Sequence, residues 1–405
     1  MKDRILLLTK DAMCKRYLPA YGDCYWKGKT PNLDELQKKG TVFQHFYTAA
    51  PSTVMAFRSM MTGKFAHETP YHDYIPMEIP ETENDFFQVA AKLGYENHLL
   101  WDERWEHMVL RYGNCFGQRV KIHNVHGLNQ PVGVHSKRTE KRQNNDELLK
   151  KTIQTLENTV ADVCESTSSK IFMWIHLPHV LKGRTCYGGD IDGFDQCLGM
   201  LRKYFLDENI FVSSDHGNMD GYQGKLGYGF DVNTSAIEIP LITPKLDGLE
   251  YCQDYVSNVD MKKIIFERAI PKREFIYSDC AYYAQPHRKL AIIHAPYVYI
   301  YNKANKKEEL YDLRYDEHQR CNLIKEMHYD IDRKLNTKIR DVYFYPDWDD
   351  LESAKAILRE KKSEVWKQAP LMYEIRGRIL AMAKQVYLFM KKFIILPIKR
   401  KLKKI

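Results

Sequence analysis

The chain has 405 residues, 44% of them hydrophobic, and a formal net charge of +8. This length and composition predict one large domain with a smaller appendage. No uninterrupted apolar stretch reaches the roughly 18–20 residues that a membrane-spanning helix needs. The positive charge gathers in the last fifteen residues, which leaves the body near neutral, so no nucleic-acid partner is expected.

The N-terminal residues predict a protein of the cytoplasm. Only four residues precede the apolar run Ile5–Thr9, which is too short and too soon interrupted for a signal peptide and resembles a first core strand. The nine cysteines form no CxxC pair, as expected of thiols in a reducing compartment.

Strand-like and helix-like segments alternate through the first 250 residues. This alternation predicts an α/β fold with a mixed, mostly parallel sheet and helices on both faces. The predicted strands are Ile5–Thr9, Val42–Tyr47, Lys170–His176 and Asn209–Ser213. The predicted helices run from Thr30 to Gly40, from Ser52 or Thr53 to Gly63, and over Gly193–Leu206. Short strands then predict a small antiparallel sheet at Phe275–Ser278, Leu290–His294, Tyr297–Asn302 and Glu309–Leu313.

These segments divide the chain into three predicted parts. Residues 1–270 form the main α/β domain, in which the polar and basic stretch 118–150 indicates a surface insertion or lid. Residues 271–325 form the small antiparallel subdomain. Residues 326–405 form a helical extension that ends in a basic, amphipathic tail.

A carboxylate and an imidazole follow directly after one predicted strand. Ser213-Ser214-Asp215-His216-Gly217 places them at the carboxyl end of the strand, where open α/β sheets bind ligands. Asp11 stands just past the first strand in the same way. Carboxylates and imidazoles bind divalent cations, so Asp11, Asp215 and His216 are predicted to share a metal ion. Asp11 as an ordinary turn residue is the structural alternative.

A hydroxyl and two further imidazoles complete the predicted site. Thr53 starts a helix, and a helix N-terminus favours phosphate or sulfate. His176 and His179 lie just past another strand. Ester cleavage at phosphorus or sulfur needs a metal, a nucleophile and a proton donor for the leaving group. Thr53 as a helix cap and both histidines as buried structural residues are the alternatives.

Four segments, in a fixed order around Asp215-His216, resemble one known family. They are Thr30–Leu36 (TPNLDEL), Ala49–Lys64, which ends in TGK, Ile191–Asp195 (IDGFD), and Glu309–Leu313 (ELYDL) with Asn322-Leu323. From about residue 5 to 325 the chain therefore resembles the sulfatase-like hydrolases and transferases of the alkaline phosphatase superfamily.

The nucleophile position departs from true sulfatases. Nine residues before Thr62 stands Thr53, where sulfatases carry a cysteine or serine that is oxidised to formylglycine. Threonine cannot be converted in this way. The resemblance therefore implies a phosphodiesterase or a phosphoethanolamine or phosphoglycerol transferase, in which the threonine is transiently phosphorylated. Ser52 is a rival nucleophile one position earlier.

Other positions depart from the family as well. Phe57 stands where sulfatases place an arginine, so Arg58 and Lys64 are only weak candidates for substrate binding. Tyr222–Gly229 lacks the histidines of many relatives, which implies a single divalent ion, Mn²⁺, Mg²⁺, Ca²⁺ or Zn²⁺. The resemblance implies that Asp11, Asp215, His216 and the Thr53 hydroxyl bind that ion.

The implied reaction is phosphoryl transfer through Thr53. His179 protonates the departing alcohol or contacts the substrate, and His176 contacts the substrate. The phosphoryl group passes from a phosphate-ester donor to water or to a sugar or polyol hydroxyl, such as one on a surface-glycan intermediate. Two alternatives stay open: a sulfuric ester hydrolase, and an inactive scaffold or glycan-binding member of the family.

The C-terminal tail allows two interpretations. Apolar residues recur at helical spacing up to Phe393, and the lysines and arginines cluster after them. Residues 377–405 therefore predict either an amphipathic helix at the inner face of a membrane, or a docked helix followed by a solvated charged end.

Overall fold

The computed structural model describes most of the chain. The described residues are 3–22, 28–68, 84–102, 119–125, 145–166, 170–178, 191–219, 221, 224–225, 227–280, 288–326, 348–368, and the single positions 379, 382, 383, 386, 389, 390 and 393. They fall into two compact units. The first lies within Met1–Lys64, Met77–Tyr228 and Ser235–Ile276, and the second within Phe65–Pro76, Gly229–Thr234 and Tyr277–Ile405.

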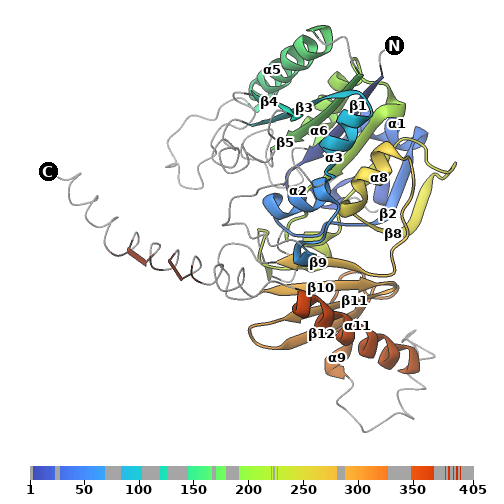
Figure 1. Cartoon of the computed structure of the whole chain (residues 1–405), viewed down its shortest axis with the longest axis vertical. Helices are drawn as coiled ribbons and strands as arrows, with labels where there is room; N and C mark the ends of the chain where they lie inside the picture. Colours follow the sequence, from blue (N-terminus) through green and yellow to red (C-terminus); the bar gives the residue numbers. More distant parts are fainter. Residues whose placement is uncertain are drawn as a thin grey trace. The chain divides into compact units, whose positions relative to one another are not determined.

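An eight-stranded sheet forms the centre of the first unit (Figure 1). Its strands, in spatial order, are β4 (Lys121–Val125), β3 (Tyr95–Asp102), β5 (Lys170–Leu177), β1 (Arg4–Lys10), β6 (Ile210–Ser214), β7 (Leu241–Thr243), β2 (Thr41–Tyr47) and β8 (Tyr251–Ser257). All paired neighbours run parallel except β7, which is antiparallel to β6 and β2. The mixed, mostly parallel sheet predicted from the sequence is confirmed.

The central strand β5 packs against helices on both of its faces. Successive side chains of a strand point to opposite sides of the sheet. Ile171, Met173 and Ile175 therefore enter one core, shared with α1 (Pro31–Lys39), α5 (Asn145–Ser166) and α6 (Ile191–Leu201). Phe172 and Trp174 enter the other, where they contact aromatic rings of α2 (Thr53–Thr62), α3 (Phe86–Lys92) and α8 (Met261–Phe266). Burial on both faces explains the continuous apolar run of this strand.

Two glycines show why the predicted helices end and pack where they do. Gly63 follows α2 with a φ of 72°, the left-handed conformation that commonly ends helices. Gly199 on α6 would place a Cβ 2.6 Å from the Asn32 side chain of α1, so glycine permits the close approach of these two helices.

The second unit contains the predicted small sheet. Its four strands lie in the order β12 (Lys307–Asp312), β11 (Tyr297–Asn302), β10 (Lys289–His294) and β9 (Ile276–Cys280). β10–β11 and β11–β12 pair antiparallel, as expected. Helices α9 (Leu323–Glu326) and α11 (Trp348–Gln368) follow in the chain. Cations contact the ring of Trp366 on α11, with Arg288 4.8 Å and Lys303 4.9 Å from its centroid.

The stretch 118–150 is described only at its ends. Both ends are regular elements: β4 is the edge strand of the large sheet, and α5 begins at Asn145. The polar edge strand was not predicted, because its sequence KIHNV lacks an apolar run. Among the described helices, none combines the length and the hydropathy that crossing a bilayer requires.

Candidate active site

Two neighbouring strand ends bring the predicted carboxylates together. β1 and β6 are parallel, and Lys10 of β1 lies in register with Ser214 of β6. The next residue on each strand is Asp11 and Asp215, respectively. Because parallel strands end at the same edge of a sheet, both carboxylates leave it at the same level.

The carboxylate of Asp215 joins the two strand ends. Its Oδ1 accepts the backbone N–H of Ala12 at 3.1 Å and that of His216 at 2.8 Å. Ala12 has a φ of 56°, a conformation uncommon for residues other than glycine. The hydroxyl of Ser214 adds a second link, since it accepts the N–H of Met13 at 2.9 Å. The turn after β1 is therefore fixed against the turn after β6.

The imidazole of His216 is oriented by its own backbone. Its Nδ1 lies 2.8 Å from the carbonyl oxygen of Gly217, which can only accept, so Nδ1 carries the proton. The lone pair of Nε2 is then available as a metal ligand, a common arrangement for ligating histidines. Gly217 is required by space, because a Cβ there would lie 2.1 Å from the carbonyl oxygen of Ser235.

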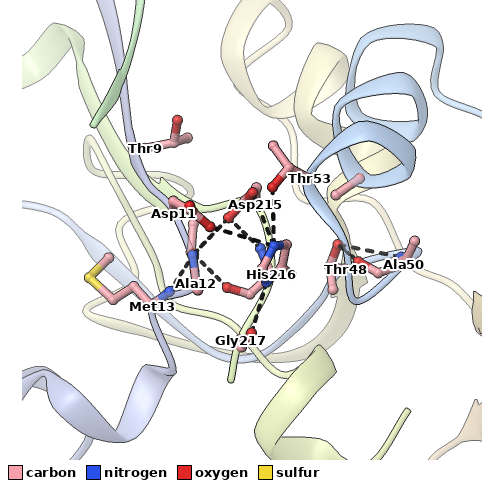
Figure 2. Close-up of polar contacts among 12 residues, drawn as sticks. Thr9, Asp11, Ala12, Met13, Thr48, Ala50, Thr53, Asp215, His216 and Gly217 are labelled. Atoms are coloured by element: carbon pink, nitrogen blue, oxygen red, sulfur yellow. Dashed lines mark hydrogen bonds and ion pairs between the residues drawn. The ribbon is translucent and has the colours of Figure 1, made fainter. Parts of the chain in front are cut away.

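Three predicted metal ligands converge in the structure (Figure 2). Ligand atoms of Asp11, Asp215 and His216 all lie within 4.8 Å of one another, and all three residues are buried. Nε2 of His216 lies 3.6 Å from Oδ1 of Asp11 and 3.4 Å from Oδ2 of Asp215. Among the described residues this is the one such group of three or more.

The donor set fits a divalent cation. Oδ2 of Asp215 is buried and makes no hydrogen bond of regular geometry, although the Thr53 hydroxyl lies close enough to interact with this carboxylate. A buried carboxylate oxygen without a regular hydrogen bond is costly unless a cation compensates its charge. Two carboxylates and one imidazole form a set of ligands that Mn²⁺, Mg²⁺, Ca²⁺ or Zn²⁺ can bind.

Thr53 approaches this group from the start of α2. Its Oγ1 lies 3.2 Å from Nε2 of His216, and Figure 2 shows the side chain pointing toward His216 and Asp215. Ser52, the rival nucleophile, is the N-cap residue and makes no side-chain capping bond. The structure thus places Thr53 beside the predicted metal ligands, and the first turn of α2 adds the N–H groups that favour an anion.

His176 is buried among other side chains. Its Nδ1 lies 2.9 Å from Oγ1 of Thr9, which accepts the indole N–H of Trp174 at 2.8 Å. The ring of Phe57 covers it edge-on at 4.7 Å. Burial lowers the pKa of His176 to about 4, although the charge of Asp215 opposes that shift. An exposed fraction of 1% disfavours a direct substrate contact.

The other predicted site residues are Lys64, Arg58 and His179. Lys64 follows the far end of α2, roughly 15 Å along the helix axis from Thr53. Burial lowers the pKa of Lys262, and the charge of Lys64 adds to that shift. Arg58 is buried, with 4% exposed. Phe57, at the family's arginine position, packs on Trp174 with ring centroids 4.3 Å apart. His179 lies outside the described residues.

Sequence reasoning missed two neighbours of the site. The ring of Tyr228 packs against that of His216 in a tilted arrangement, with centroids 4.5 Å apart. Its place in Gly227-Tyr228-Gly229 was noted only for lacking a histidine. Ser214 was also missed, although it directly precedes Asp215, because a hydroxyl inside a strand gives no sign of its partner 201 positions away.

A comparison with protein-family models identifies the fold family. Residues 4–244 match the model of the family described as Sulfatase. The chain belongs to the sulfatase family. This family is one of hydrolases of sulfate or phosphate esters, and the buried Asp-Asp-His group is consistent with its divalent metal site. No curated protein sequence matches the chain.

Solved structures show the same fold at low identity. A candidate sulfatase of Bacteroides thetaiotaomicron VPI-5482 is 13% identical, with a TM-score of 0.66 over 92% of this chain and 96% of that one. The 2-O GAG sulfatase BT1596 is 14% identical, with a TM-score of 0.62 over 90% and 93%. The phosphonate monoester hydrolase of Agrobacterium radiobacter is 14% identical, with a TM-score of 0.59 over 88% and 96%. The sulfatase-like fold predicted from the sequence is confirmed.

Proposed function

We propose that this sulfatase-family protein is a metal-dependent phosphoryl-ester hydrolase or transferase that works through a phosphothreonine at residue 53. The observation that carries the proposal is the 3.2 Å separation between Oγ1 of Thr53 and Nε2 of His216, inside the buried group with Asp11 and Asp215. A threonine has no route to formylglycine, but its hydroxyl can attack phosphorus.

A bound metal ion and the N-terminus of α2 would both compensate the negative charge of the phosphoryl group. Asp11, Asp215 and His216 would hold one divalent ion, with the Thr53 hydroxyl beside them. Such an ion supplies positive charge that acidifies a nearby hydroxyl and neutralises phosphoryl oxygens. The free N–H groups of the first turn of α2 would bind the same oxygens, since Thr53 is its first residue.

The first half of the reaction transfers the phosphoryl group to the protein. Oγ1 of Thr53 gives its proton to solvent water and forms a bond to phosphorus, while the bond from phosphorus to the alcohol oxygen breaks. The departing alkoxide takes up a proton, the step for which the sequence suggests His179. In the second half, water or a sugar or polyol hydroxyl attacks the phosphothreonine and restores the Thr53 hydroxyl. A phosphodiester donor of the phosphoethanolamine or phosphoglycerol kind suits this scheme.

The similar structures support either ester class. The same fold occurs in a protein named phosphonate monoester hydrolase and in one named a 2-O GAG sulfatase. Two residues favour phosphate esters: residue 53 is a threonine, and Phe57, which packs on an aromatic ring, stands where sulfatases carry an arginine. Sulfate ester hydrolysis is therefore the rival that an experiment must exclude.

The test compares the ester classes directly. Purified protein with Mn²⁺ is assayed on bis(p-nitrophenyl) phosphate, p-nitrophenyl phosphate and p-nitrophenyl sulfate, beside Thr53→Ala and the matched control Ser52→Ala. We expect phosphodiester turnover that Thr53→Ala abolishes and Ser52→Ala largely keeps, with a phosphorylated Thr53 peptide in the mass spectrum. Sulfate turnover that survives Thr53→Ala would contradict the proposal. Absence of both turnover and metal binding would favour an inactive scaffold.

A further inference from the structure

Exposed apolar side chains lie near the C-terminus. The described positions between 379 and 390 are helical, and six large apolar side chains from 379 to 393 are 43–67% exposed. These side chains are Ile379, Met382, Val386, Phe389, Met390 and Phe393. By comparison, apolar side chains of α11 such as Leu351 and Leu358 are buried. Exposed aromatic and aliphatic side chains at this density mark an interaction surface.

The six positions have the spacing of one side of a helix. At about 100° per residue, their positions fall within an arc of about 100°. The rings of Phe389 and Phe393, one turn apart, are 4.7 Å from each other and so form a continuous apolar strip. This geometry is that of a helix which lies along an apolar boundary.

The positive charge of the same segment favours an anionic partner. Residues 375–405 contain no aspartate or glutamate and ten basic residues: Arg376, Arg378, Lys384, Lys391, Lys392, Lys399, Arg400, Lys401, Lys403 and Lys404. The rest of the chain then holds 51 of the 61 basic residues against all 53 acidic ones, so the net positive charge of the protein resides here. A second copy of the chain would bring ten like charges against ten, which disfavours pairing through this face.

We propose that residues 377–405 bind the surface of an anionic lipid bilayer. The apolar strip enters the boundary between head groups and acyl chains, and the lysines and arginines contact anionic head groups. The proposed segment lies in the interface and does not cross the bilayer. This inference does not depend on the reaction proposed for Thr53.

Sedimentation of the full chain with vesicles tests the proposal. The vesicles contain either phosphatidylcholine alone or equal parts of phosphatidylcholine and phosphatidylglycerol, at about 0.1 M and about 1 M salt. Phe389→Glu disrupts the strip. Ile357→Glu is the matched control, because Ile357 is an exposed apolar residue on α11. The pair Lys391→Gln and Lys392→Gln removes charge without changing the strip, and thermal melting checks that each variant is folded.

We expect the wild-type protein to sediment with the anionic vesicles only, and less at high salt. Phe389→Glu should weaken partitioning at least about tenfold, as loss of a buried aromatic ring plus an added negative charge implies. Each lysine removed should weaken it about fivefold, whereas Ile357→Glu should leave it unchanged. No sedimentation, equal sedimentation with both vesicles, or indifference to Phe389→Glu and to the lysine pair would overturn the proposal. So would a dimer in light scattering that Phe389→Glu dissociates.

Discussion

Asp215 and Ala12, 203 positions apart in the chain, are joined by a hydrogen bond of 3.1 Å from the backbone N–H of Ala12 to Oδ1 of the carboxylate. The same oxygen accepts the N–H of His216, whereas Oδ2 lies 3.4 Å from Nε2 of that histidine. One oxygen therefore holds the two turns together, and the other is left for a cation.

We predict that the structural role of Asp215, which accepts two backbone N–H groups, can be separated from its role in binding a cation. Asp215→Asn keeps a carbonyl oxygen for the two backbone N–H groups but removes the negative charge. We expect stability within about 1 kcal/mol of wild type and an affinity for Mn²⁺ at least ~100-fold weaker. Calorimetric titration measures the affinity, and urea unfolding measures the stability.

Asp215→Ala is the matched comparison. It leaves the buried N–H groups of Ala12 and His216 without their acceptor, which should cost about 2–4 kcal/mol of unfolding free energy. Wild-type Mn²⁺ affinity in Asp215→Asn, or equal stability of the two variants, would contradict the division of the carboxylate.

Gly217 is predicted to be indispensable for stability. An added Cβ would lie 2.1 Å from the Ser235 carbonyl oxygen, and the nearest atoms of Ser235 and Ala236 are all backbone atoms that cannot rotate aside. Gly217→Ala should therefore lower the unfolding free energy by about 2–3 kcal/mol. Gly94→Ala is the control, because Gly94 has open space and only a positive φ, which costs about 1 kcal/mol. If both variants lose the same unfolding free energy in urea, the backbone around Gly217 shifts to accommodate the added Cβ, and the prediction is wrong.

Asp195 is predicted to stabilise the fold and not to take part in the reaction. Its carboxylate on α6 accepts the backbone N–H of Leu33 at 2.8 Å and the side-chain amide of Asn32 at 2.9 Å, at the start of α1. Asp195→Ala should cost about 1–3 kcal/mol and speed hydrogen exchange in α1. The control Asp192→Ala, at the more exposed start of α6, should cost less than about 1 kcal/mol. Normal stability with lost turnover would point to a catalytic Asp195 instead.

The stability of the protein should fall in mild acid, partly because of His98. Burial first, and the neighbouring His123 second, lower the pKa of His98 from 6.5 to about 4. The unfolded chain then binds the proton more tightly than the folded one, so this contribution is complete above pH 6.5 and is lost as the pH falls toward 4. Urea unfolding between these values measures the slope.

His98→Asn should flatten that slope without abolishing it. Other buried histidines, His176 and His67 among them, also have lowered pKa values because of burial and add to the slope. The stability of the variant at pH 8 serves as its own baseline. An unchanged slope in His98→Asn would mean that this histidine titrates alike in the folded and unfolded states.

The elements around the site were predictable because each carries its own local pattern. The apolar runs before Asp11 and Asp215 form β1 and β6 as predicted, and α2 runs from Thr53 to Thr62. Strands β3, β4, β7 and β8 were not predicted; the sequence of β4 lacks an apolar run, and β8 exposes the side chains of Tyr251 and Gln253. Pairing in the sheet, and not composition, makes β4 and β8 strands.

By itself the sequence determined that carboxylates, an imidazole and a hydroxyl stand at strand and helix ends, because those positions follow from local periodicity and capping. Only the tertiary structure decided which of them meet. The register of Lys10 with Ser214 brings Asp11 to Asp215, and packing brings Thr53 within 3.2 Å of His216. The tertiary structure also buries His176 next to Thr9, and the sequence did not predict this burial. Such pairings join residues about 160–200 positions apart, where burial of the whole sheet, and no local preference, fixes the partner.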